Sequence, residues 1–130
     1  MEHTPSHSIA WTPAPGDHFT GDVWFGPLAE PIVPGALNAL GVLFSPSART
    51  DWHTHPEGQV LYVASGAGRV GTDTEVVDIA AGDVVVSPPG ERHWHGAAPG
   101  SYLMHLSLTT GGATEWETNK VTGDEYGAGR

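Results

Sequence analysis

The sequence predicts an all-β protein, built as a sandwich or barrel of short strands. Three observations favour this class. Glycine and proline are abundant, at 18 and 11 residues, which suits tight turns better than long helices. Short runs rich in β-branched and aromatic residues recur along the chain with turn residues between them. No strong helical period runs through any part of the sequence.

The expected strands are separated by recognisable breaker residues. The strand at 23–25 ends at a Gly-Pro pair, and the strand at 38–44 ends at a Ser-Pro pair. The Ser-Gly-Ala-Gly run at 65–68 is expected to be a turn. Residues 69–70 and 76–79 are expected to form a hairpin around a polar tip. The remaining strands are expected at 52–55, 59–64, 84–87 and 102–108.

One domain is expected at 17–130, because nothing in the sequence marks a second globular unit or an internal repeat. Residues 1–16 carry several prolines and show little periodicity, so they are expected to form a flexible N-terminal arm. The tail that begins at Gly111 is expected to hold a short terminal helix anchored by Trp116.

The charge balance is strongly acidic, with 15 Asp and Glu residues against 5 Lys and Arg and a formal net charge of −10. Such a field disfavours nucleic acid and anionic membranes as partners, and a small molecule is the expected ligand. The absence of cysteine excludes disulfides and thiolate metal ligands. Since no segment resembles a signal peptide or an apolar membrane span, a cytoplasmic location is expected.

Two similar histidine pairs are the strongest functional signal in the chain. His53 and His55 are one residue apart, and His93 and His95 repeat that spacing later in the sequence. Because side chains at i and i+2 lie on the same face of a strand, each pair presents two imidazoles to one side of a sheet. If the two strands face each other, the imidazoles converge in one small volume, as a divalent transition metal requires.

The residues around the two pairs form longer motifs. The first is His53-x-His55 followed by Gln59 and Gly66, and the second is Gly82-x5-Pro88-x-Gly90-x2-His93. Together they resemble the two signature motifs of the cupin superfamily, whose members are small jelly-roll β-barrels. The resemblance implies that the metal ligands are His53, His55, Gln59 and His93.

The chain departs from the usual cupin pattern at one ligand, because Gln59 stands where most cupins have glutamate. A glutamine oxygen can still bind a cation, but it carries no charge, so a bound metal keeps its full positive charge. Three histidines and a glutamine on a cupin frame resemble the small bacterial manganese-dependent hydroxynitrile lyases. The segments at 19–21, 48–56, 93–99 and 121–126 are similar to that subgroup as well.

Two histidines are candidate catalytic residues. In the related lyases, a histidine trailing the second motif and one on the last strand line the cavity, and the resemblance gives these places to His95 and His105. The implied reaction cleaves or forms the carbon–carbon bond of a small hydroxynitrile. His105 would remove the hydroxyl proton, while protonated His95 and the metal stabilise the departing anion. The alternative is a structural role for both residues. His95 would then be a hydrogen-bond partner beside the metal site, and His105 would be a buried core histidine.

A nitrogen and oxygen donor set without sulfur suits several divalent metals. The family resemblance favours Mn²⁺, with Fe²⁺, Ni²⁺, Zn²⁺ and Co²⁺ as alternatives. Small cupins usually pair, often by exchanging N-terminal strands, so a homodimer or homotetramer is expected.

The sequence does not identify the substrate, because the walls of a barrel pocket come from side chains on many strands. Two other functions stay open. Metal cupins also act as dioxygenases or as other small-molecule lyases and isomerases, and a non-catalytic small-molecule binder would have the same fold. The residues expected to line the substrate pocket are Leu40, Val42, Phe44, Leu61 and Leu103.

Overall fold

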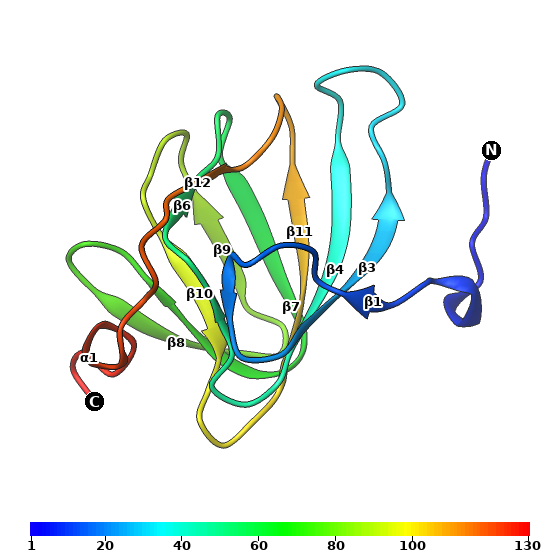
Figure 1. The fold of residues 1–130 in the computed structure, drawn as a ribbon. Helices are drawn as coiled ribbons and strands as arrows, with labels where there is room; N and C mark the ends of the chain where they lie inside the picture. Colours follow the sequence, from blue (N-terminus) through cyan, green and yellow to red (C-terminus); the bar gives the residue numbers. More distant parts are fainter.

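The computed structural model describes residues 1–130 as one strongly curled antiparallel β-sheet with short flanking elements (Figure 1). Its helices are a single 3-10 turn, η1 (Ser6–Ser8), and α1 (Gly123–Tyr126), and neither is long and apolar enough to cross a membrane. The strands are β1 (Thr12–Pro13), β2 (Phe19–Thr20), β3 (Val23–Ala29), β4 (Asn38–Phe44), β5 (Arg49–Thr50), β6 (His53–Thr54), β7 (Gln59–Gly71), β8 (Val76–Ala80), β9 (Val84–Ser87), β10 (Trp94–Ala97), β11 (Leu103–Thr109) and β12 (Glu115–Trp116). The predicted all-β class is confirmed, as a half-barrel of the jelly-roll type.

The long strand β7 joins the two halves of the curl. Its first part pairs with β11 and β9, and its second part pairs with β10 and β8. The order along the main path of this ten-stranded sheet is β1-β3-β4-β11-β7-β10-β5-β2, and β8 and β9 pair with β7 off this path. The two remaining strands, β12 and β6, form a separate pair that crosses one end of the curl. The inner side of the curl is therefore enclosed by both halves of β7.

The predicted turn at 65–68 is wrong, because β7 continues through this segment. Gly66 has a φ of +82°, and a side chain there would collide with the carbonyl oxygen of Tyr102. The register between β7 and β11 also shifts at this level, between Met104 and His105. The glycine therefore bends one strand from the first half of the sheet into the second, where the sequence predicted a chain reversal.

The predicted end of the first long strand at the Gly-Pro pair is also wrong, since β3 runs on to Ala29. The neighbouring strand β1 pairs only with Trp24 and Phe25, so Pro27 lies where β3 has become an edge strand. A proline is tolerated at an edge because it has no backbone N–H to donate to a further strand.

The N-terminal arm leaves the body beyond β1 and extends away from the sheet (Figure 1). Just before β1, the Trp11 ring packs against β3 and β4, where a side chain on Gly26 or Gly41 would collide with it. The arm is thus attached to the sheet over Trp11 to Pro13. The division into an arm at 1–16 and a domain at 17–130 stays a prediction.

The core has two parts on opposite sides of the curl's second half. The main cluster lies inside the sheet and includes Val42, Phe44 and Leu103. The smaller cluster packs Trp52 and Trp94 against the C-terminal segment, and includes Val121 and Tyr126. The expected terminal helix exists as α1, but its anchor is the buried Tyr126. Trp116 lies earlier, in β12, which corrects the predicted anchor.

Candidate metal centre

The two histidine motifs meet inside the curl. His53 and His93 form a β-bridge in which each backbone N–H donates to the other residue's carbonyl oxygen at 3.0 Å. This pairing brings the first and second motifs side by side, which meets the condition under which their imidazoles were expected to converge. One ring nitrogen each from His53, His55 and His93 lies within 4.8 Å of the other two, and all three residues are buried.

Backbone carbonyls fix the orientation of two of these imidazoles. The Nδ1 atom of His53 lies 2.9 Å from the carbonyl oxygen of Asp51, and Nδ1 of His93 lies 2.8 Å from that of Glu91. A carbonyl only accepts hydrogen bonds, so each Nδ1 carries the hydrogen atom and each Nε2 keeps a lone pair. The Nε2 of His55 is buried without any hydrogen-bond partner. The cluster therefore presents nitrogen lone pairs that no protein donor satisfies.

Gln59, the first residue of β7, adds an oxygen donor. Its side-chain nitrogen donates to Ser107 Oγ at 2.8 Å, which turns the amide oxygen Oε1 toward His93 Nε2 at 3.1 Å. Both of these atoms are hydrogen-bond acceptors, so no hydrogen atom lies between them. Two ligands at right angles, each about 2.1 Å from one metal ion, are separated by roughly 3 Å. The donors present thus fit a divalent cation.

The electrostatics of the cluster favour uncharged imidazoles. Burial lowers the pKa of His53 well below its usual value, and repulsion from a protonated His93 acts in the same direction. Burial, again with repulsion from His93, lowers the pKa of His55 to about 4. The pKa of His93 is lowered chiefly by burial as well. The neutral form is the one that binds a metal, so these ligands are ready for a cation at neutral pH.

His95 and His105 form a second pair beside the cluster. His95 lies on β10 and His105 on β11, and His95 Nδ1 is 2.9 Å from His105 Nε2. The Phe44 ring packs against both imidazoles, and its centroid lies 6.0 Å from that of His95 and 5.2 Å from that of His105. Burial lowers the pKa of His105 to about 3 and that of His95 well below its usual value. The remaining nitrogen of each ring, His95 Nε2 and His105 Nδ1, has no partner.

A cavity of about 170 Å³ opens beside these residues. His95 lines it together with His53, His55 and Gln59, whereas His105 is not among its lining residues and lies behind His95. Of the residues expected in the pocket wall, Leu40 and Val42 line the cavity. Phe44 and Leu103 lie in the main core, and Leu61 is buried on β7 outside this cavity.

Several cavity residues were not identified from the sequence. They come from strands far apart in the chain, and the largest of them are Phe19, Phe25 and Trp116. Phe19 belongs to a segment that supported the family resemblance, but no spacing signal connects any of the three to the histidine motifs. Only the curl of the sheet brings them together.

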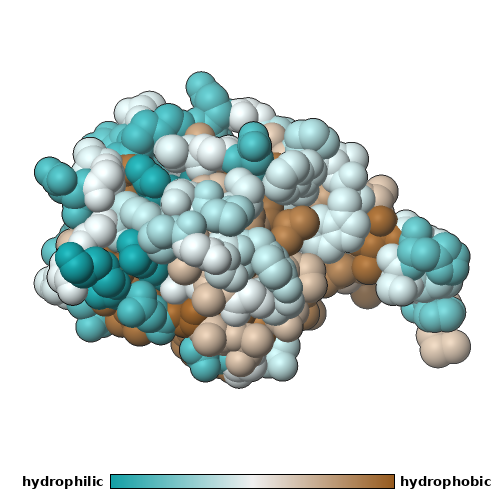
Figure 2. Space-filling view, turned by 90° about the horizontal axis from the view of Figure 1, so that it is seen from below, coloured by the Kyte–Doolittle hydropathy of each residue, from teal (hydrophilic) through white to brown (hydrophobic).

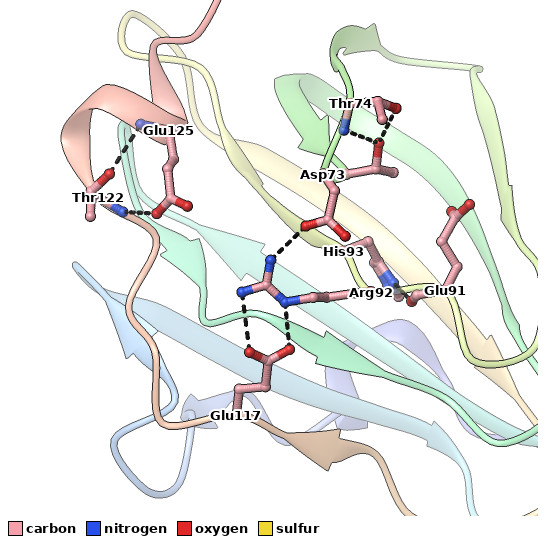
Figure 3. Close-up of polar contacts among 9 residues, drawn as sticks. Asp73, Thr74, Glu91, Arg92, His93, Glu117, Thr122 and Glu125 are labelled. Carbon is pink, nitrogen blue, oxygen red and sulfur yellow. Dashed lines mark hydrogen bonds and ion pairs between the residues drawn. The ribbon is translucent and has the colours of Figure 1, made fainter.

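Trp116 closes one side of the site. It pairs with His53 in the β12–β6 ladder, and its ring centroid lies 4.7 Å from that of His53. The exposed side of the indole stacks on His18 at 4.6 Å with the rings nearly parallel. Arg92 fixes the position of the chain that follows β12. Its guanidinium donates two hydrogen bonds to Glu117 and one to Asp73 (Figure 3). This network connects the residue next to His93 with the residue next to Trp116.

Comparison with known proteins identifies relatives of this arrangement. A family model described as a cupin domain matches residues 42–108, which include both histidine motifs. The chain is 43% identical over 116 residues to a protein from Granulicella tundricola named (R)-mandelonitrile lyase, covering 86% of this chain and 88% of that one.

Solved structures have the same fold. A cupin-like protein from Thermotoga maritima superposes with a TM-score of 0.82 at 39% identity, covering 88% of this chain and 90% of that one. The polyketide cyclase RemF from Streptomyces resistomycificus superposes with a TM-score of 0.77 over 97% of this chain and 90% of its own, at 15% identity. At that identity the second likeness concerns the fold alone.

Proposed function

We propose that this chain, which belongs to the cupin family, is a metal-dependent lyase that cleaves, and in reverse forms, the carbon–carbon bond of a small hydroxynitrile. The name of the 43% identical relative, (R)-mandelonitrile lyase, supports this reaction class. The observation that carries the proposal is the position of His95. Its unpartnered Nε2 belongs to a residue that lines the same cavity as three of the four uncharged donors, His53, His55 and Gln59.

The metal would be held by His53, His55, Gln59 and His93, and we propose Mn²⁺ as the ion. All four donors are neutral, since the histidine pKa values are lowered and Gln59 carries no charge. When bound there, a divalent metal supplies an uncompensated positive charge that stabilises a neighbouring oxygen anion or cyanide. Glutamine cannot act as a proton acceptor in place of the usual glutamate, so proton transfer falls to other residues.

The family resemblance gave the proton-accepting role to His105, but we assign this role to His95, because His95 lines the cavity and His105 does not. The lowered pKa of His95 keeps the imidazole neutral at physiological pH, so Nε2 can accept the hydroxyl proton of a hydroxynitrile in the cavity. The electron pair of the O–H bond then forms the carbonyl double bond, and the carbon–carbon pair leaves with cyanide. Cyanide takes the proton back from His95, which gives one carbonyl compound and one hydrogen cyanide. In this scheme, His105 orients His95 and exchanges a proton with its Nδ1.

The apolar part of the cavity wall is suited to the side group of such a substrate. Phe19, Phe25 and Trp116 supply aromatic surface, and Leu40 and Val42 supply aliphatic surface. Phe19 contacts both other rings edge-on, with centroid distances of 5.6 Å to each. An apolar wall of this kind favours an aryl or alkyl group and leaves the hydroxyl and nitrile for the polar side.

The proposal is tested by measuring metal content and cyanide release on mandelonitrile with the same protein sample. We expect cyanide release by the metal-loaded protein, its loss after chelation, and its return when Mn²⁺ is added. His95→Leu should abolish the activity without removing the metal. The matched control His7→Leu lies on the exposed arm and should change neither quantity.

Two results would contradict the proposal. Activity that survives complete removal of the metal would exclude the metal-dependent mechanism. A metal-loaded protein that releases no cyanide from mandelonitrile or from an aliphatic hydroxynitrile would exclude the lyase reaction, while leaving the metal centre itself in place.

A further inference from the structure

We infer that the cavity contains a second polar subsite, formed by Asn38 and Thr109, which selects substrates whose aromatic ring carries a neutral hydrogen-bonding group such as a phenol hydroxyl. This pair of residues is called the distal subsite below. The inference rests on the proposed function, because it specifies which class of hydroxynitrile the same cavity takes. It concerns two residues that neither hold the metal nor move the proton in that function.

The strand register places the distal subsite in one row with a proposed metal ligand. Thr109, the last residue of β11, lies directly opposite Gln59 on β7 and directly opposite Asn38 on β4. Residues opposite each other in antiparallel strands point to the same side of the sheet, and all three line the cavity. Neighbouring strands are about 4.8 Å apart, so the Cα atom of Asn38 is roughly 10 Å from that of Gln59. A single aromatic ring with its substituents bridges a separation of this size once the side chains reach inward.

The two side chains carry hydrogen-bonding groups that the chain itself does not use. Five hydroxyl or amide side chains line the cavity apart from the proposed ligands. The hydroxyls of Thr50, Ser107 and Thr114 each lie within hydrogen-bond distance of a partner in the chain. The amide of Asn38 and the hydroxyl of Thr109 have no such partner, and both residues are half-buried. Water satisfies these two groups until a ligand of matching chemistry replaces it.

Asn38 is the exception in an otherwise apolar strand. No other residue of β4 has a side chain that can form a hydrogen bond, and asparagine is depleted in strands generally. On the outward side of β4, the Trp11 ring lies against Gly41, and Figure 2 shows hydrophobic surface at the root of the N-terminal arm. The single hydrogen-bonding side chain of this strand is therefore directed to the cavity.

A hydrogen bond beyond this row fixes the position of the distal subsite. The backbone N–H of Gly111 donates to the carbonyl oxygen of Gly35 at 2.9 Å, which joins the loops just outside β4 and β11. Asn38 and Thr109 are thereby held in register at the ends of their strands. A pair fixed in this way loses little conformational freedom when a ligand binds.

The chemistry of the cavity wall defines the group that fits. An amide and a hydroxyl each offer a donor and an acceptor, which matches a hydroxyl on the substrate. No Asp, Glu, Lys or Arg lines the cavity, so a charged substituent would lose its hydration without a counter-charge. Leu40 and Val42, the next inward residues of β4, provide apolar surface for the ring itself. The structure thus favours a hydroxynitrile with a hydroxyl-bearing aromatic ring.

Equilibrium binding of two unreactive alcohols to the metal-loaded protein tests this inference. The alcohols para-hydroxybenzyl alcohol and para-methylbenzyl alcohol have nearly the same shape and keep the carbinol group of the substrate, but only the first carries a phenol hydroxyl. Neither contains a nitrile, so ligand-detected NMR titration measures binding without turnover. We expect the wild type to bind the phenol about threefold to tenfold more tightly, which is the range of one net hydrogen bond.

Two variants of the distal subsite and one control complete the test. Asn38→Leu keeps the size of the side chain without its polar atoms and should remove the preference for the phenol. Thr109→Val should reduce the preference as well, and it provides an independent measurement if Asn38→Leu unfolds. The matched control Thr110→Val lies just beyond β11, where its hydroxyl donates to Glu57 outside the cavity, and should leave the preference unchanged. Circular dichroism melting checks that each variant retains the fold.

Equal affinity of the wild type for the two alcohols would overturn the inference, and so would binding of neither. A preference retained in both Asn38→Leu and Thr109→Val would overturn it as well, because the phenol hydroxyl would then be held elsewhere. Loss of cyanide release with an unchanged preference would concern only the proposed function.

Discussion

His95 Nδ1 and His105 Nε2 lie 2.9 Å apart in a region closed to solvent, so the two rings share one hydrogen atom. The position of that hydrogen atom determines whether His95 Nε2, the nitrogen that remains free, is a hydrogen-bond donor or an acceptor. When His95 Nδ1 carries it, the other nitrogen of His95 is an acceptor, and when His105 donates it, that nitrogen is a donor. One exchange between the rings therefore switches His95 between taking and giving a proton, as the two halves of the proposed reaction require.

Replacing His105 tests this coupling. His105→Phe removes both ring nitrogens while keeping an aromatic ring in the core, so the orientation and proton exchange of His95 are lost. We expect cyanide release to fall about a hundredfold, in the range of a lost acid–base contribution, with unchanged metal content. Turnover rate and metal stoichiometry are measured on the same sample, with His3→Phe on the arm as the control. Full activity in His105→Phe would rule out the coupling.

Ser107 holds the side-chain amide of Gln59 in position. Ser107→Ala removes the acceptor that holds the side-chain nitrogen of Gln59, so the amide oxygen is no longer fixed toward His93. We expect metal affinity to fall about tenfold to a hundredfold, the usual effect of losing a residue that orients a ligand. Competitive metal titration measures the change. Ser101→Ala, on an exposed loop, provides the control, and equal affinities in the two variants would contradict the assignment of Gln59 as a ligand.

The metal-free protein should lose stability in acid. The pKa of His105 is lowered by burial to about 3 in the folded chain, whereas an unfolded histidine titrates near 6.5. Between these pH values the unfolded chain binds the extra proton, so the free energy of unfolding decreases as the pH falls from about 6.5 toward 3, by up to about 1.4 kcal/mol per pH unit for each such histidine. The buried histidines at 53, 55, 93 and 95 shift in the same direction.

Urea unfolding of the chelated protein at a series of pH values measures this dependence. The His105→Phe variant should have a slope smaller by about one proton over the same interval. A free energy of unfolding that stays constant between pH 6.5 and 4 would show that these histidines are not buried in the metal-free protein.

The Arg92–Glu117 contact should affect both stability and substrate binding. Glu117→Gln removes the charge from a two-point contact with N–O distances of 2.6 and 3.1 Å, and we expect a loss of about 1 kcal/mol in the free energy of unfolding. Because Glu117 follows Trp116, the cavity wall should also loosen, which raises KM more than it lowers kcat. Asp73→Asn, which changes only the exposed partner of Arg92, is the matched control and should have a much smaller effect on both quantities.

The fold class could be predicted from the sequence because strand and turn patterns are local, whereas the convergence of the two histidine pairs was expected only on the condition that their strands face each other. Alternation along a strand orients His53 with His55 and Leu103 with His105, wherever the strands finally lie. The bend at Gly66 was not predictable in this way. A glycine at positive φ serves a turn and a strand bend equally well, and only the pairing of β7 with four other strands distinguishes them.

The wall of the cavity escaped prediction for a related reason. Phe19, Phe25 and Trp116 come from three strands with no common motif, and their convergence depends on long-range register. That His95 lines the cavity while His105 does not likewise depends on how β10 and β11 lie relative to the cavity. Alternation gives the side on which a residue points but not its distance from the opening.

The bridge between His53 and His93 has a consequence for the lifetime of the folded chain. A metal held by both residues would connect the two motifs only in the folded chain, because the bridge that brings them side by side does not exist in the unfolded chain. Any ion that binds only the folded form also adds a free energy of RT ln(1 + [L]/Kd). The abundance of this protein in a cell would then depend on the supply of free metal, through degradation of whatever fraction remains unloaded.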